Sequence, residues 1–183
     1  EKETLEIAKQ LEVECRAYLT ELVPLFGEEN KEKIETSIPK EATKVASLIE
    51  GRDEQQRVIL FHTSPAVLEV SKRLEKLPSY LDDFAQIAGA KVVVIGPDAE
   101  RTSIVTRVIK KCNALLIRGV GALCWASTTS DAEAVVMIVE KNCKAALLAL
   151  EVPTVKPIGW LDTHLMRFVY QKKYSKIAEG EET

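Results

Sequence analysis

The feature that most constrains the fold of this chain is a change in the spacing of its apolar residues near residue 57. Before it, apolar residues recur only at helical spacing, which predicts helices over residues 5–26 and 39–51. After it, short β-branched runs alternate with helical stretches. This alternation predicts an α/β fold, a layered sheet flanked by helices, with an all-helical N-terminal segment over residues 1–51.

Four short runs predict the strands of that sheet: 57–62, 91–95, 113–118 and 121–126. A glycine turn separates the last two, which predicts a hairpin. One helix is expected from Ser64-Pro65 through Leu77, and a second begins at Ser79, where Asp82 completes a capping-box-like pattern. A third runs from a capping box of Ser130 and Glu133 to about Leu150, and a last helix begins near Gly159.

The 183 residues are 46% hydrophobic and 29% charged, which predicts a single globular domain over residues 1–177. The acidic end, residues 178–183, is expected to be a disordered tail. A net charge of −3 argues against a nucleic-acid or anionic-membrane surface, and no apolar run is long enough to span a bilayer. The polar N-terminus lacks a signal-peptide pattern and the four cysteines form no CxxC pair, so a reducing cytoplasm is the expected location.

Four segments in the middle of the chain carry a family resemblance: HTSPAVLEVS (62–71), LPSYLDDFAQIAG (77–89), NALLIRGVGALCWASTTSDAEA (113–134) and VEKNCKAALLAL (139–150). Together they resemble the head domain of the class II aldolase/adducin family over residues 58–150. The resemblance implies the fold of that family. In the family's enzymes it also implies a divalent metal, usually zinc, held by an H-x-H pair and by the histidine of N-H-G, with an upstream carboxylate for acid–base work.

The sequence departs from this pattern at the metal ligands. Aligned on the helix start, the H-x-H positions are Phe61 and Thr63, and the third ligand position is Val120. The chain has two histidines, His62 and His164, so one chain cannot supply three histidine ligands. We therefore expect no metal or other cofactor, and a zinc ion only with mixed ligands, supplied in part across a subunit interface. The family's phosphate loops are also missing from the N-terminal half, which weakens the case for a sugar-phosphate substrate.

Two residues are candidates for acid–base catalysis. His62 ends a strand beside the Ser64-Pro65 helix start, where α/β proteins place their sites. Glu41 lies near the position of the family's glutamate. The alternatives are a histidine bonded to backbone at a strand end, and a solvent-facing glutamate favoured by the helix dipole.

Five further residues are candidates for binding a small anionic or carbonyl ligand beside His62: Thr63, Ser64, Arg118, Gly119 and Gly121. Arg118 would pair with an anion. The alternatives are a surface arginine next to a hairpin turn, and a serine that caps a helix rather than acting as a nucleophile.

These observations leave two functions open. One is a divergent, metal-free binding or oligomeric scaffold module, and the other is a lyase or isomerase that acts on a small carbonyl or sugar-phosphate compound. A homo-oligomer is expected, because Trp160, His164 and Phe168 form an aromatic stripe on the last helix and the family resemblance implies a subunit boundary nearby.

Overall fold

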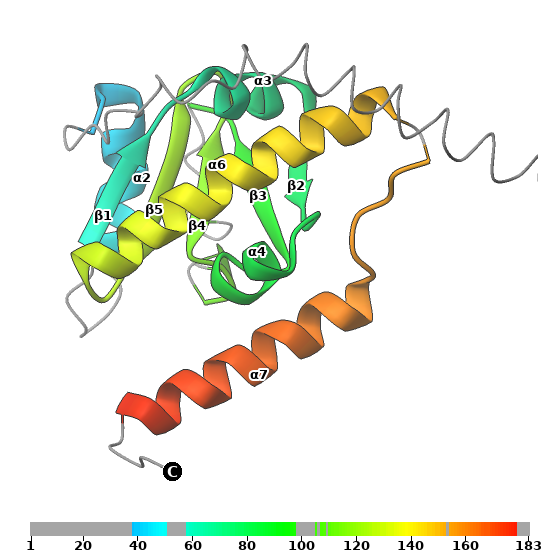
Figure 1. Ribbon diagram of the computed structural model, residues 1–183. Coiled ribbons are helices and arrows are strands. Elements are labelled where there is room, and N and C mark those ends of the chain that lie inside the picture. Colours follow the sequence, from blue (N-terminus) through cyan, green and yellow to red (C-terminus); the bar gives the residue numbers. More distant parts are fainter. Residues whose placement is uncertain are drawn as a thin grey trace, which may run out of the picture. The chain divides into compact units, whose positions relative to one another are not determined.

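The computed structural model describes residues 38–50, 58–97, 105, 107–108, 110–152 and 154–178. Its elements follow in chain order: α2 (Lys40–Glu50), β1 (Val58–His62), α3 (Pro65–Arg73), β2 (Lys76–Pro78), α4 (Asp82–Ile87), β3 (Lys91–Ile95), β4 (Ala114–Ile117), β5 (Gly121–Ala126), α6 (Thr129–Glu151) and α7 (Trp160–Ala178). The strands form one five-stranded sheet in the order β1-β5-β4-β3-β2 (Figure 1).

The sheet is mixed, and three of its strands end at the same edge. β3 and β4 are parallel, whereas β5 runs antiparallel to both β1 and β4, and β2 runs antiparallel to β3. His62, Ile95 and Ile117 therefore end their strands side by side, and Gly121 opens β5 opposite Ile117. This carboxyl edge is the place where the sequence predicted a site.

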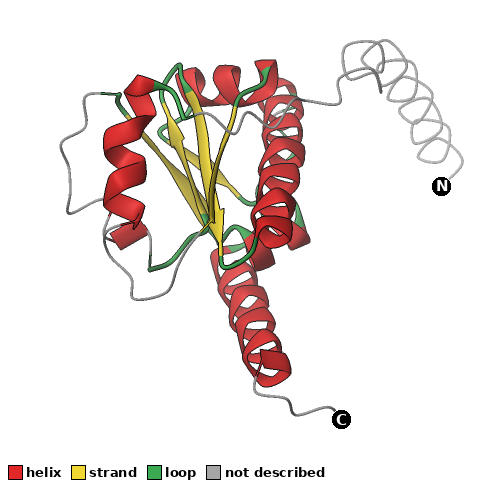
Figure 2. Ribbon diagram, turned by 90° about the vertical axis from the view of Figure 1, so that its left-hand side faces the viewer, coloured by secondary structure: helices red, strands yellow, loops and turns green. Residues whose placement is uncertain are grey.

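Helices cover both faces of the sheet (Figure 2). On one face, α3, α4 and α6 pack over a large apolar core that includes Leu60 of β1. On the other face, α2 packs with Val105 and Val108 over a second core that includes Phe61. Neighbouring residues of β1 thus point to opposite cores, because side chains alternate along a strand. The predicted α/β fold is confirmed, as are the bounds of β3 and β5 and the hairpin between β4 and β5.

The prediction of a continuous helix through Leu77 is wrong. α3 ends at Arg73, and Leu74 has extended backbone angles, φ −113° and ψ 146°. Leu77 lies instead in β2, where it pairs with Val92 and is fully buried. Its distance along the chain from Val70 fits a helix, but its burial comes from the sheet. Pro78 is tolerated there because β2 is an edge strand.

Both predicted capping boxes are also wrong in position. α4 begins after Leu81, which makes no side-chain capping bond, while Ser79 donates to the carbonyl of Ala90 at 2.9 Å. α6 begins earlier than expected, since the hydroxyl of Thr128 accepts from the amide of Asp131 at 3.1 Å. The start of α6 is shifted because Thr128 and Ser130 lie in one stretch and either type of residue can cap a helix.

α2 confirms the helix predicted over residues 39–51, and α7 includes Ala178, where the tail was expected to begin. Residues 1–37 and 179–183 lie outside the described residues, so the helix over 5–26 and the disordered tail from 179 stay predictions. The single-domain boundary at residue 177 stays a prediction with them. None of the helices in the described part of the chain is long and apolar enough to cross a membrane.

Candidate functional site

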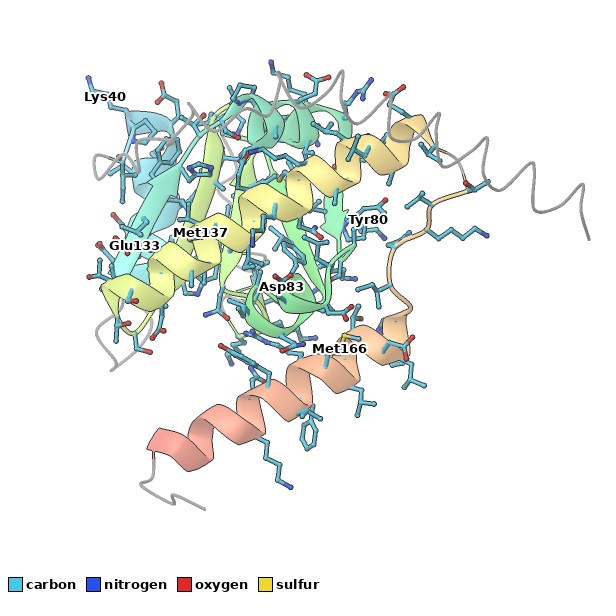
Figure 3. The ribbon with its side chains drawn as sticks, viewed as in Figure 1. Lys40, Tyr80, Asp83, Glu133, Met137 and Met166 are labelled. Atoms are coloured by element: carbon cyan, nitrogen blue, oxygen red, sulfur yellow. The ribbon has the colours of Figure 1, made fainter. Side chains whose placement is uncertain are left out.

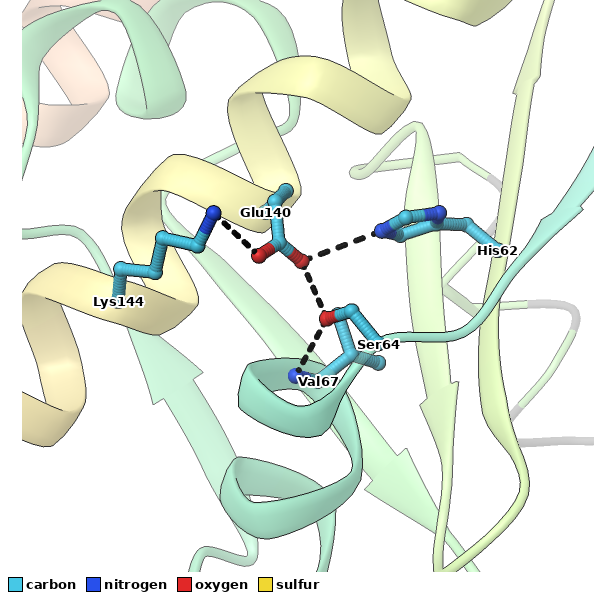
Figure 4. Close-up of polar contacts among 5 residues, drawn as sticks. All are labelled: His62, Ser64, Val67, Glu140 and Lys144. Atoms are coloured by element: carbon cyan, nitrogen blue, oxygen red, sulfur yellow. Dashed lines mark hydrogen bonds and ion pairs between the residues drawn. The ribbon is translucent and has the colours of Figure 1, made fainter. Parts of the chain in front are cut away.

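Four polar side chains meet between the sheet and α6 at the carboxyl edge (Figure 4). Nε2 of His62 lies 3.1 Å from Oε2 of Glu140, and the hydroxyl of Ser64 donates to the same oxygen at 2.5 Å. The other carboxylate oxygen, Oε1, forms an ion pair with Nζ of Lys144 at 3.0 Å. We call these four residues the Glu140 cluster.

Local sequence explains how each member reaches the cluster. His62 follows Phe61 in β1, so it points to the α6 side while Phe61 points to the α2 side. Ser64 has an extended backbone and caps α3, accepting from the amide of Val67 at 3.1 Å. Its hydroxyl proton stays available for Glu140. Lys144 lies one helical turn after Glu140, on the same side of α6.

The cluster is buried, and its charge is balanced inside the protein. His62, Ser64 and Glu140 are 1%, 5% and 6% exposed, whereas the side chain of Lys144 reaches solvent. Burial by itself raises the pKa of Glu140. Hydrogen bonds from His62, Ser64 and Lys144, together with the charge of Lys144, outweigh burial and lower that pKa to about 2. Glu140 is therefore ionised at neutral pH.

This arrangement ties three elements to one carboxylate. β1 contributes His62, the start of α3 contributes Ser64, and the middle of α6 contributes Glu140. Chemically, the cluster can hold one buried negative charge and the protons that neutralise it. His62, Ser64 and Glu140 are buried and Lys144 alone of the four reaches the surface, so the cluster joins these three elements.

Sequence reasoning found His62 and Ser64 but missed Glu140 and Lys144. The available signal was the position of Glu140 in the most apolar part of a long helix, where an isolated acid is uncommon. The sequence could not name the partner of this acid, since His62 is 78 residues away along the chain.

The structure separates the other candidates from His62. Arg118 donates through Nη1 to the carbonyl of Lys72 at 3.0 Å and through Nη2 to Glu75 at 2.7 Å. These partners lie at the end of α3, whereas His62 lies beside its start. The amide of Gly119 likewise donates to the hydroxyl of Ser71 near the end of α3, at 2.9 Å. A nine-residue helix spans about 13 Å, so the contacts of Arg118 and those of His62 lie at opposite ends of α3.

Gly121 has a packing role in the structure. Its φ is +157°, and a Cβ added there would lie 2.6 Å from the ring of Phe61 and 2.7 Å from the carbonyl of His62. The remaining candidates are Thr63 and Glu41. Thr63 is half-buried between β1 and α3. Glu41 is exposed in the first turn of α2, across the sheet from His62. The structure therefore does not bring Glu41 and His62 together.

In the alignment made from the sequence, two of the three positions that correspond to the family's metal ligands carry apolar side chains, Phe61 and Val120. Phe61 is 3% exposed in the α2-side core, and Val120 packs against the same core. Neither side chain has an atom that can bind a metal. Across the described ranges, moreover, no three His, Cys, Asp or Glu side chains come together as a metal-binding group.

Comparisons with known proteins agree with this fold. Residues 23–147 match the family model described as the class II aldolase and adducin N-terminal domain. The match begins well before residue 58, where the resemblance read from the sequence began. Comparison with curated proteins finds no match.

Several solved structures have a similar fold. An L-fuculose 1-phosphate aldolase is 19% identical with a TM-score of 0.61, covering 73% of this chain and 65% of its own. YgbL from Klebsiella pneumoniae is 12% identical with a TM-score of 0.59, covering 70% of this chain and 66% of its own. The L-fuculose 1-phosphate aldolase from Glaciozyma antarctica PI12 is 17% identical with a TM-score of 0.55, and the match covers 79% of this chain and 61% of that protein. At these identities the likeness shows the fold alone, and the chain spans 65% of the length of the first of these proteins.

Proposed function

Because the chain belongs to the class II aldolase and adducin family, we propose that it is a binding or scaffold module of that fold that does not use the family's three-histidine metal site. The observation that carries the proposal is that Phe61 is buried in the α2-side core and Val120 packs against that core. In the alignment made from the sequence, these residues stand where two of the three histidines would be.

The direction of His62 supports the same proposal. It follows Phe61 directly, so it lies on the other face of the sheet, where Glu140 holds it. The other histidine, His164, lies on α7. Its Nδ1 is 2.8 Å from the carbonyl of Trp160 on the same helix. A ligand set would have to be built from other residue types or from another subunit.

We further propose a reducing cytoplasm as the location, in keeping with the buried thiols of Cys112 and Cys124. Burial raises the pKa of the Cys112 thiol to about 11 despite the charges of Arg167, Lys91 and Lys111, and burial also raises the pKa of Cys124. Both thiols therefore stay protonated and unreactive at neutral pH.

Metal analysis tests the proposal directly. The purified chain is incubated with zinc, desalted and measured by elemental analysis, and zinc binding is followed in parallel by isothermal titration calorimetry. We expect far less than one zinc per chain. Stoichiometric zinc would overturn the proposal, and its loss in His62→Ala but not in His164→Ala would identify a mixed-ligand site at the sheet edge.

A second assay addresses catalysis. A panel of small carbonyl and sugar-phosphate compounds, including L-fuculose 1-phosphate, is tested for carbon–carbon cleavage and isomerisation with and without added divalent metal. We expect no turnover. Thermal shifts measured on the same panel report whether any compound binds. Turnover that disappears in His62→Ala and Glu41→Gln would instead support the lyase or isomerase function.

A further inference from the structure

The short helix α4 depends on another helix to complete its C-terminal end. The last carbonyl groups of an α-helix have no partner within the helix. In α4, Nη1 of Arg167, from α7, donates to two of them, the carbonyls of Gln86 and Ile87. Asn113 serves the next one, since its amide donates to the carbonyl of Ala88 at 2.9 Å, and its side-chain oxygen accepts from Nη2 of Arg167. One side chain of α7 therefore completes α4 and joins it to the residue before β4.

The chain segments that lead into and out of α4 and into α7 meet at Ser79. Its carbonyl accepts from the amide of Ile158, in the connector before α7, at 2.8 Å. Its hydroxyl donates to the carbonyl of Ala90, just after α4, at 2.9 Å. Asn142 of α6 holds the same place, because its Oδ1 accepts from the amide of Tyr80 at 2.8 Å. This point is thus fixed to α6 and to the start of β3, and both helices extend from it.

α7 is attached to the domain mainly through polar groups. Thr163 is buried, and Met166 lies on the side of α7 that faces α4 (Figure 3). None of the apolar side chains described in α7 is buried, and large ones such as Leu165 and Phe168 are exposed on the outer side. Because burial of apolar surface is what usually docks a helix, the hold on α7 depends strongly on Arg167.

Each of the two helices therefore needs the other. α4 has six residues and no side-chain cap at its start, so it is not stable by itself in water. It lies between α6 and α7 (Figure 1), and its Phe84 is fully buried in the core that α3, α4 and α6 cover, which we call the α6-side core. We propose that α4 and α7 form one lid over the α6-side core, which opens and closes as a unit about Ser79.

The lid links the surface of α7 to the core beneath α4. Opening withdraws Phe84 from the α6-side core and uncovers an apolar site there. A ligand that binds only the closed form shifts the equilibrium toward that form. Any partner that holds α7 in its present position would therefore also keep α4 closed. This inference does not depend on the proposed absence of a metal site, so the two can fail separately.

Native-state hydrogen exchange on the full chain tests whether the two helices open together. Away from the core neither helix stays formed, so the exchange of its amides reports opening. In Arg167→Met, the amides of α4 and of α7 should exchange faster by the same factor, about tenfold or more, while those of α3 keep the wild-type rates. Gln171→Met is the matched control, because Gln171 is exposed on α7, and it should change neither helix.

Three results of this experiment would overturn the proposal. Faster exchange in α7 alone would show that the helices open separately. An equal increase in α3 would show that the whole domain opens and that no lid exists. Unchanged exchange in both helices would show that Arg167 does not hold them closed.

A second pair of variants weakens α4 and reads the effect on α7. Gln86→Gly and Gln86→Ala remove the same side chain and leave the backbone carbonyl to which Arg167 donates. Glycine weakens a helix relative to alanine, so exchange in α4 should be about threefold or more faster in the glycine variant. Because coupling between two sites is reciprocal, α7 should show the same ratio. Equal α7 rates in the two variants, with α4 rates that differ, would contradict a common opening.

Discussion

Replacing Glu140 with glutamine should destabilise the fold and change how its stability depends on pH. The substitution keeps the size and shape of the side chain but removes its negative charge. Oε2 then no longer presents a carboxylate to Ser64 and His62, and Lys144 loses its ion pair at Oε1. Breaking a buried, hydrogen-bonded pair in this way costs about 2–4 kcal/mol at pH 7.

The lowered pKa of Glu140 leads to a cost of similar size. A pKa of about 2 in the folded state, against about 4.3 when unfolded, corresponds to about 3 kcal/mol of stabilisation by the ionised form. Because the folded pKa is the lower one, this contribution is complete above the unfolded value. It declines as the pH falls through 4.3 toward 2. By pH 3 the wild type should have lost about half of it.

Urea unfolding of Glu140→Gln and wild type from pH 7 to pH 3 measures both effects. The gap between their free energies of unfolding should be widest near pH 7 and should narrow below pH 5. Glu133→Gln is the matched control, since Glu133 is exposed on the same helix, and its effect should stay within about 0.5 kcal/mol. A gap below about 1 kcal/mol at pH 7, or one that does not change with pH, would refute the reasoning.

Two other substitutions test the packing around the site. Gly121→Ala should cost about 2–4 kcal/mol in thermal unfolding, because its Cβ would meet the ring of Phe61 at 2.6 Å, whereas Gly96→Ala, with nothing within 4 Å, should be tolerated. An equal response of the two glycines would contradict the close approach. Arg167→Met should release α7 and speed amide exchange along it about tenfold or more, whereas the exposed Gln171→Met should not. Unchanged exchange in Arg167→Met would show that the helix is held by other contacts.

Much of the fold follows from local patterns in the sequence. Gly96-Pro97 follows β3 and Gly121 opens β5, and these breaks helped to place the strands correctly. The sequence also predicted that the side chains of His62 and Phe61 point to opposite faces of the sheet, because side chains alternate along a strand. β2 was missed because it has three residues, one of them proline, and its single buried residue sits at helical distance from α3.

The Glu140 cluster could not be predicted because it depends on which helix covers which strand. The sequence indicated that His62 leaves β1 toward a helix-covered face, but it could not show that α6 lies there. The same limit explains Arg118. Its position after β4 was predicted, whereas its partners at the end of α3 depend on how α3 lies along the sheet edge.

The Glu140 cluster and Gly121 together fix the register of β1 against its neighbours. The cluster also acts against alternative registers of β1, because a buried charge that loses its partner is costly. A slip of β1 by one residue would turn Phe61 toward Glu140 and leave that carboxylate buried without His62. The same slip would move the Phe61 ring away from Gly121, which directly precedes Ala122, the partner of His62 in β5. We infer that these two contacts select one register, and that this register is the one that keeps Phe61 in the α2-side core and His62 away from it.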